Sequence, residues 1–141
     1  MHGIHTDEAV AESTATQEEI VAIQDPLTER VIACAFKVQN TLGCGFLEKV
    51  YENAMLHECR KAGLAVANQH PIRVHYDGTV VGEYAADLLI ENRLLVELKA
   101  VKALDDIHLA QCLNYLKATG LKVCLLINFG KPELEIRRVV L

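Results

Sequence analysis

The stretch that decides the fold spans residues 85–99 and reads AADLLIENRLLVELK. It contains two short, mostly apolar runs, at 85–90 and 94–99, on either side of a polar turn at 91–93. Short runs of branched apolar residues bounded by turn residues are typical of strands. The sequence therefore predicts two neighbouring strands joined by a tight turn.

Three charged side chains interrupt this apolar pair: Asp87 in the first run, and Glu97 and Lys99 in the second. Because side chains alternate along a strand, Glu97 and Lys99 point to the same face, and the turn brings Asp87 alongside them. Two close carboxylates repel each other unless a positive charge lies between them, and hard divalent cations prefer oxygen ligands. A neighbouring lysine can position a metal-bound water or assist its deprotonation.

A different interpretation is that these three residues form weak ion pairs on a solvent-facing surface. Their place inside apolar runs fits that interpretation less well, because an unpaired charge is costly to bury. On the residues alone, both interpretations stay open.

The other expected strands extend this pair in both directions along the chain. Asp77-Gly78 is a favoured two-residue hairpin turn, and Pro71 is expected to separate or bulge the two runs before it. The continuous apolar run after residue 122 is typical of a buried strand. In chain order, the expected strands are 64–70, 72–76, 79–84, 85–90, 94–99, 122–128 and 134–141.

Three helices are expected from apolar residues at helical spacing and from the residues at their ends. Aspartate caps the free N–H groups of a first turn, proline suits the first helical position, and glycine ends a helix. The expected helices run from Asp25-Pro26 to Gly43, from the turn at 43–45 to Gly63, and from Asp105 or Asp106 to Thr119.

The order of these elements predicts an α/β (mixed α+β) fold, in which helices flank a central mixed β-sheet. The strand–helix–strand passage at 94–128 is expected to form a right-handed parallel crossover. We expect one domain over residues 25–141, preceded by a flexible acidic tail at 1–24 with a frayed helix around 17–23.

The composition is that of a soluble globular domain, since 51% of the 141 residues are hydrophobic and 23% are charged. No apolar run approaches the roughly 20 residues that span a bilayer, so no membrane association is expected. The net charge of −5 is uneven: residues 1–25 hold six acids and no base, and residues 26–141 hold 13 acids and 14 bases. A strongly basic footprint for nucleic acid is therefore absent.

The five cysteines are scattered, and none falls in a C-x-x-C pair. This spacing argues against a disulfide framework and against a structural zinc site. The first 24 residues also lack the pattern of a secretory signal. A reducing, cytoplasmic location is the expectation.

Two motifs connect this sequence with a known group of proteins. Asp87 followed by Glu97-x-Lys99 resembles the signature of the PD-(D/E)xK nuclease superfamily. Residues 45–51, GFLEKVY, match the G-x-x-E-x-x-Y motif of the small GxxExxY proteins, which are placed in that superfamily. The resemblance covers about 26–141 and implies a restriction-endonuclease-like core. One departure is Ala86, which stands where the signature often has proline.

The resemblance implies a role for each matching residue. Asp87 and Glu97, with a backbone carbonyl near Leu98, would hold Mg²⁺ or Mn²⁺, and Lys99 would be the catalytic lysine. Glu48 would face the metal or orient its water. A first-turn acid stabilised by the helix N-terminus is the alternative for Glu48, with equal weight.

The remaining motif residues have supporting roles in this interpretation. Gln111 and Tyr115 match a Gln-x-x-x-Tyr helix motif, in which Gln111 would reach the substrate or the water and Tyr115 would support it. Alternatively, Gln111 is an exposed helix residue and Tyr115 a packing residue. Tyr51 is favoured as a core residue with a satisfied hydroxyl rather than a catalytic one. None of His70, His75 and His108 is expected to bind a metal, and candidate phosphate contacts are Lys102, Lys117, Lys122, Arg137 and Arg138.

The function that these motifs imply is a metal-dependent phosphodiester hydrolase, a nuclease acting on nucleic acid, with DNA favoured. The alternative is a non-catalytic module that keeps the nuclease scaffold and binds nucleic acid or protein, which the near-neutral charge of 26–141 favours. A homodimer is compatible with either function, through the apolar strand at 123–127 or through the edge of the hairpin.

Overall fold

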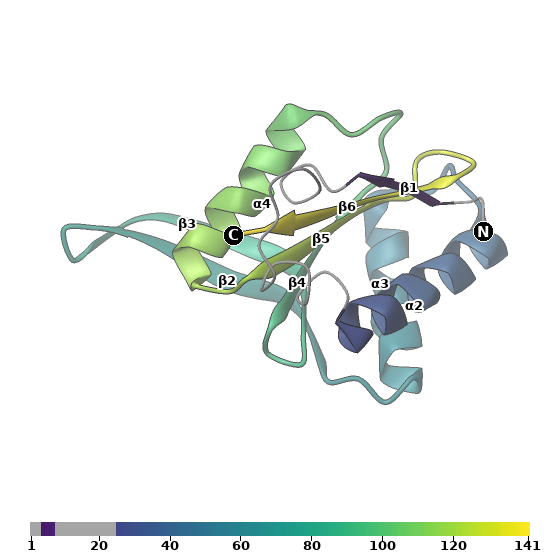
Figure 1. Ribbon diagram of the computed structural model, residues 1–141, viewed down its shortest axis with the longest axis horizontal. Coiled ribbons are helices and arrows are strands. Elements are labelled where there is room, and N and C mark those ends of the chain that lie inside the picture. The colour runs from purple at the N-terminus through teal and green to yellow at the C-terminus, as the bar shows by residue number, and fades with distance from the viewer. Residues whose placement is uncertain (1–3, 8–24) are drawn as a thin grey trace.

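The computed structural model describes residues 4–7 and 25–141, and over these residues the chain forms three helices and six strands (Figure 1). In chain order they are β1 (Ile4–Asp7), α2 (Pro26–Leu42), α3 (Glu48–Lys61), β2 (Val66–Tyr76), β3 (Thr79–Ile90), β4 (Leu94–Lys99), α4 (Asp106–Thr119), β5 (Val123–Asn128) and β6 (Leu134–Val140).

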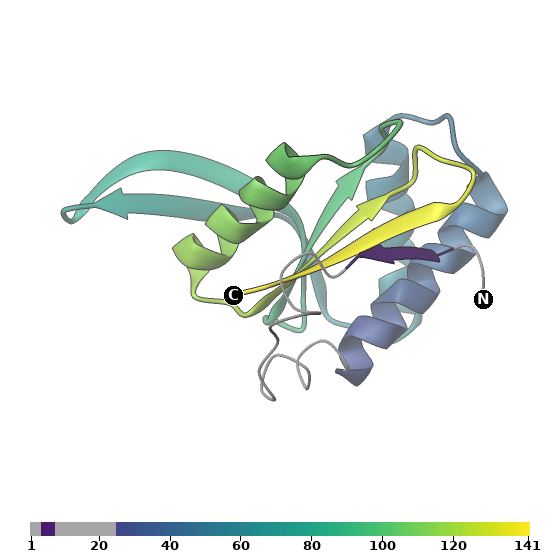
Figure 2. The ribbon, with the colours of Figure 1, turned by 45° about the horizontal axis from the view of Figure 1, so that its top comes forward.

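The strands form one mixed sheet in the order β1-β6-β5-β4-β3-β2. The pairs β1–β6 and β4–β5 are parallel, and the other neighbours are antiparallel. Helices α2 and α3 cover one face of the sheet and α4 covers the other (Figure 2). The predicted mixed fold, with helices on both sides of a central sheet, is confirmed, as is the parallel arrangement of the two strands that flank α4.

Helices α2 and α4 begin and end where their terminal residues predict, whereas α3 begins at Glu48, after Leu47, without a side-chain cap. The Asp25 side chain accepts a hydrogen bond from the N–H of Leu27 at 2.9 Å and so caps α2. Asp105, rather than Asp106, caps α4, and its carboxylate accepts from the N–H of Ile107 at 3.0 Å. Gly120 ends α4 with a left-handed backbone, which glycine adopts without steric cost.

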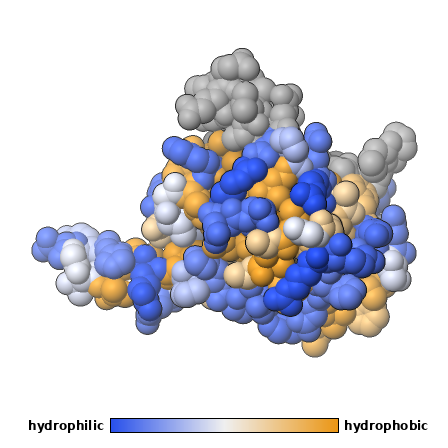
Figure 3. Space-filling view, turned by 90° about the horizontal axis from the view of Figure 1, so that it is seen from below, coloured by the Kyte–Doolittle hydropathy of each residue, from blue (hydrophilic) through white to orange (hydrophobic). Residues whose placement is uncertain are grey.

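Strands β2 and β3 form a long hairpin that projects from the body of the molecule (Figure 3). Its turn is Asp77-Gly78, with φ of 52° and 76°, as a hairpin turn of the predicted kind requires. The expected interruption at Pro71 is wrong, because β2 is continuous and Pro71 pairs with Ala85. Proline is tolerated there because β2 is an edge strand, with no strand on its outer side among the residues that the structure describes.

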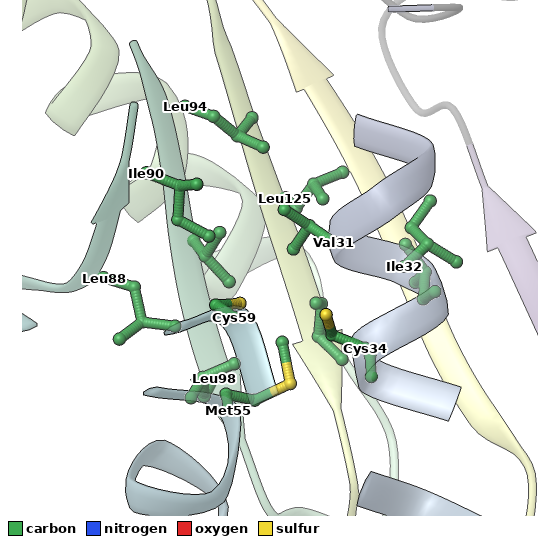
Figure 4. Packing of buried hydrophobic residues seen from close by; sticks show 14 of the residues in the cluster. Val31, Ile32, Cys34, Met55, Cys59, Leu88, Ile90, Leu94, Leu98 and Leu125 are labelled. Atoms are coloured by element: carbon green, nitrogen blue, oxygen red, sulfur yellow. The ribbon is translucent and has the colours of Figure 1, made fainter. Parts of the chain in front are cut away.

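The sheet is buried on both faces by two separate apolar clusters. Leu88, Leu98 and Leu125 point toward α2 and α3 (Figure 4), whereas Leu95 and Leu126 point toward α4. Every residue of β5 is buried, because β5 lies between β4 and β6 and under helices on both sides. Dimerisation through the strand at 123–127 is therefore a wrong expectation, since that strand has no free surface.

The predicted tail contains one element that the sequence did not indicate. Strand β1 pairs in parallel with β6, with Ile4 opposite Leu134. The helix expected around 17–23 lies outside the described residues. Within 4–7 and 25–141, no helix is both long enough and apolar enough to cross a membrane.

Candidate active site

The candidate site lies where β3 and β4 separate. Their ladder holds only three residue pairs, from Ile90–Leu94 to Leu88–Val96. Beyond it, side chains replace the backbone ladder: the Asp87 carboxylate accepts a hydrogen bond from the N–H of Leu98 at 2.8 Å, and the Glu97 carboxyl accepts from the N–H of Asp87 at 3.4 Å. The two carboxyl groups predicted to meet are therefore brought together at the end of the ladder.

Glu97 has an environment that disfavours its charge. The residue is 4% exposed, and burial is the main cause that raises its pKa to about 9, followed by the nearby charge of Asp87. The cost of burying a carboxylate beside a second one falls when a proton neutralises one of them, or when a cation binds oxygens of both groups. The chemistry of this pair thus fits a divalent cation.

Lys99 follows two residues later on the same face of β4 and is half-buried. Its segment is tied to the end of β5 by several hydrogen bonds. The N–H of Phe129 donates to the Lys99 carbonyl at 2.8 Å, and the Asn128 amide both accepts from the N–H of Val101 at 3.0 Å and donates to its carbonyl at 2.9 Å. Gly130 packs so closely here that a Cβ on it would lie 2.2 Å from the Val101 carbonyl oxygen.

Glu48 is the first residue of α3 and reaches the same region from the other side. Partial removal from water is the main cause that raises its pKa, while the charge of Lys99 and a hydrogen bond from the Ala100 backbone oppose the rise and Asp87 adds to it. Its carboxylate is thus within electrostatic reach of both Lys99 and Asp87. The alternative role predicted for Glu48, an acid in the first turn of a helix, describes its position but not these partners.

Tyr51 is fully buried and holds the loop that precedes Glu48. Its hydroxyl donates to the Gly43 carbonyl at 2.7 Å and accepts from the N–H of Phe46 at 3.3 Å. Its ring stacks on Phe129 with a centroid separation of 4.7 Å. The structure therefore places Tyr51 in the core, as a residue that fixes the start of α3.

Gln69 is a member of the site that sequence reasoning missed. Its side-chain amide donates to Glu52 at 2.9 Å and to Asp87 at 3.4 Å. The neighbouring Asn68 also donates to Glu52, at 3.3 Å, although consecutive strand residues ordinarily face opposite ways. The positive φ of Gln69, 51°, allows both to reach the buried Glu52, and no local sequence signal indicates that backbone geometry.

Gln111 and Tyr115 approach the site from α4 and share one helix face, as their spacing predicts. The Gln111 amide donates to the Tyr115 hydroxyl at 2.9 Å. Burial, followed by the charge of Glu97, raises the pKa of Tyr115 to about 12, which places this phenol near the carboxylate pair. Tyr84 of β3 packs against Tyr115 with centroids 5.7 Å apart.

Most of the remaining residues considered as metal or phosphate contacts lie away from the carboxylate pair or have structural partners. The Nδ1 atom of His108 accepts a hydrogen bond from the N–H of Asp105 at 3.1 Å and completes the cap of α4. Of the five candidate phosphate contacts, Lys117 lines a groove beside the site and the other four do not. Arg137 pairs with Glu135 at 3.4 Å in β6.

The protein donors available to a metal are few. Within the described parts of the chain, no group of three or more His, Cys, Asp or Glu residues is arranged to hold a metal ion. Asp87 and Glu97 supply carboxylates, and the Leu98 carbonyl lies on the same strand edge as the Leu98 N–H that Asp87 binds. Such a sparse oxygen set fits a hard divalent cation that retains several of its waters.

Comparison with curated protein sequences gave no significant match. Among solved structures, the chain is similar to an alkaline exonuclease from Laribacter hongkongensis, with 16% sequence identity, a TM-score of 0.49, and coverage of 98% of this chain and 77% of that one. The family model described as the PD-(D/E)XK nuclease superfamily matches residues 25–139. That match covers most of the chain and includes every residue of the site described above, and the chain belongs to the PD-(D/E)XK nuclease superfamily.

Proposed function

We propose that this protein is a metal-dependent phosphodiester hydrolase that acts on nucleic acid, with DNA as its favoured substrate. Nucleases of this superfamily generally use divalent metals, and Mg²⁺ or Mn²⁺ is the proposed cofactor. The observation that carries the proposal is the meeting of Asp87 and Glu97 at the point where β3 and β4 separate. Lys99 follows two residues later on the same face of β4, and its charge acts on Glu48. The motif at 45–51 supports a place in the GxxExxY branch of the superfamily.

The cation would be held by Asp87, Glu97 and the Leu98 carbonyl, and when bound it supplies a Lewis acid for the phosphoryl oxygens. The Lys99 ammonium would stabilise negative charge that develops on the phosphate during attack by water. Glu48 would orient that water, and partial removal from water raises its pKa, which makes its carboxylate a stronger proton acceptor. Gln111 would reach the substrate or the attacking water at the rim of the site, and Tyr115, whose hydroxyl accepts a hydrogen bond from the Gln111 amide, would support it.

The test is a cleavage assay with single- and double-stranded DNA and RNA in Mg²⁺ or Mn²⁺. Asp87→Asn and Lys99→Met are each expected to lose at least about a hundredfold in rate, because each removes a group that stabilises the transition state. Asp77→Asn and Lys37→Met are the matched controls, since Asp77 lies in the hairpin turn and Lys37 in α2, and both should keep the wild-type rate. Absence of cleavage in every condition, or equal cleavage by all variants, would contradict the proposal.

A second candidate is a module that binds nucleic acid or protein and does not cut. The near balance of 13 acids and 14 bases over residues 26–141 favours it, because nucleases with long duplex contacts are commonly more basic. Calorimetric titration with Mn²⁺ separates the two candidates. A hydrolase should bind Mn²⁺ and lose that binding in Glu97→Ala, whereas a scaffold without a metal site should release no binding heat.

We also propose a cytoplasmic location and a homodimer. Because β5 is buried, the edge of the β2–β3 hairpin, formed by the outer strand β2, is the surface proposed for a second copy. Light scattering after size exclusion measures the mass directly. A mass equal to that of one chain, 15.6 kDa, would contradict the dimer.

A further inference from the structure

The β2–β3 hairpin passes beside α4 (Figure 2). Side chains of the hairpin and of α4 line a groove of about 1050 Å³ that reaches Lys99 at the candidate site. Arg73, His75 and Tyr84 line it from the hairpin. Asn114 and Lys117 line it from α4. A substrate that approaches Lys99 along the groove therefore touches side chains of the hairpin and of α4 that are not among the proposed metal ligands.

The groove differs from the rest of the molecule in its charge. Among residues 4–7 and 25–141, its lining includes the bases Arg73, Lys99 and Lys117 and no aspartate or glutamate, whereas residues 26–141 as a whole hold 13 acids and 14 bases. Arg73 forms an ion pair with Glu83 at 3.4 Å, but both side chains are largely exposed, so a phosphate can replace that carboxylate at little cost. The lining is thus complementary to a polyanion.

The groove also presents an aromatic ring. Tyr84 is 53% exposed, and its ring packs against Tyr115 at an angle of 47°, which leaves part of its surface open to the groove. A nucleobase can stack on such a ring only when it has left the base stack of a duplex. Basic side chains combined with an exposed ring are the features with which proteins bind single strands without sequence preference.

We propose that this groove binds a single strand of nucleic acid, with a base stacked on Tyr84 and phosphates contacted by Arg73 and Lys117. The strand then passes Lys99 and presents a phosphodiester to the carboxylate pair. This inference rests on the proposed function for its cleavage step, whereas binding in the groove is independent of the metal.

The first experiment measures binding by fluorescence anisotropy, with labelled oligothymidylate and with a duplex of the same length. The full chain is used in a chelator, so that binding is measured without cleavage. The single strand is expected to bind about tenfold or more tightly than the duplex, because only unpaired bases can use Tyr84. Equal or tighter binding of the duplex would overturn the inference.

The second experiment identifies the groove with substitutions at its walls. Tyr84→Ala is expected to weaken single-strand binding about tenfold, and Tyr84→Phe to restore it, because stacking needs the ring and not the hydroxyl. Tyr76→Ala is the matched control, since Tyr76 lies on the same hairpin, is 74% exposed and does not line the groove. Equal losses in Tyr84→Ala and Tyr76→Ala would overturn the inference.

The basic residues have a distinct readout in the salt dependence of binding. Arg73→Ala and Lys117→Ala should each reduce the slope of log K against log salt by about 0.7, the value expected for one phosphate contact on a single strand. Lys37→Ala, on the opposite side of the sheet, should leave the slope unchanged. An unchanged slope in both groove variants would overturn the phosphate contacts.

The two proposals fail in different ways. If the groove variants weaken single-strand binding but no metal supports cleavage, the hydrolase is contradicted and the groove is supported. If the wild type cleaves DNA and Tyr84→Ala cleaves single strands at the same rate with the same KM, the groove is contradicted and the hydrolase is supported.

Discussion

The strands in the centre of the sheet and those of the β2–β3 hairpin differ in how far their apolar side chains are buried. In the body, Leu125, Leu126 and Ile127 of β5 are fully buried. In the outer part of the β2–β3 hairpin, Val81 and Tyr84 are 60% and 53% exposed. Asp87 lies where the hairpin leaves the body, so one wall of the candidate site is tightly packed and the other is open to solvent.

This difference separates two tasks. Glu97 and Lys99, which the proposed hydrolysis would need in a fixed geometry, stand on the packed strand β4, where neighbouring elements on both sides restrict them. Groups that would contact a variable substrate, such as Tyr84, stand on the hairpin. We therefore expect substitutions in the body to cost folding free energy, and matched substitutions in the hairpin to leave it nearly unchanged.

The largest effect is expected for Leu125→Ala. Leu125 is fully buried in the central strand, so the substitution leaves a cavity and should lower the free energy of unfolding by about 3 kcal/mol. Urea unfolding followed by circular dichroism measures it. Val80→Ala in the hairpin, where Val80 is 45% exposed, should change it by less than about 0.5 kcal/mol. Equal effects would remove the contrast between the two regions.

The second largest effect is expected for Gly130→Ala, which should lower the free energy of unfolding by about 2–3 kcal/mol. The added Cβ would lie 2.2 Å from the Val101 carbonyl oxygen and 2.4 Å from its nitrogen, so the backbone beside Lys99 must shift. Gly82→Ala in the hairpin is the control, because its nearest neighbour is a Tyr84 side-chain carbon at 3.4 Å. Wild-type stability in Gly130→Ala would show that this segment is not held as the structure indicates.

Tyr51→Phe should lower the free energy of unfolding by about 1 kcal/mol, because it removes a buried hydroxyl that makes two hydrogen bonds. The loop before Glu48 should also exchange its amide hydrogens faster, as measured by hydrogen–deuterium exchange. Tyr76→Phe, at an exposed hairpin position, should have neither effect. Unchanged exchange in Tyr51→Phe would contradict the role assigned to the hydroxyl.

The smallest effect is expected for Asp25→Asn, which should lower the free energy of unfolding by about 0.5 kcal/mol near neutral pH. Asparagine still caps α2, but the substitution removes the charge that pairs with Arg93, whose hydrogen bond is the main cause that lowers the pKa of Asp25. A carboxyl with a lowered folded pKa stabilises above its unfolded pKa of about 3.9 and loses this contribution as the pH falls through the folded value.

The stability difference between wild type and Asp25→Asn should therefore shrink below about pH 4. Thermal unfolding at several pH values measures this trend. Asp77→Asn in the hairpin turn is the control and should match the wild type at each pH, because asparagine also adopts the positive φ found there. A difference for Asp25→Asn that grows on acidification would contradict the assigned ion pair.

Local signals in the sequence determined the ends of α2 and α4, the Asp77-Gly78 turn and the buried character of β5. Each of these depends on a few neighbouring residues: a cap, a positive φ or an uninterrupted apolar run. The alternation of side chains along β4 was also enough to place Glu97 and Lys99 on one face. The pairing of Asp87 with the Leu98 N–H agrees with that placement but is not implied by it.

Tertiary structure alone decided which distant groups meet. The positive φ of Gln69 brings two consecutive side chains to Glu52, the Ala100 backbone binds Glu48, and β1 pairs with β6 across most of the chain. The groove likewise exists only because the hairpin passes beside α4. Contacts of this kind depend on the packing of whole elements, whose energy is spread over many residues, so no short stretch of sequence encodes them.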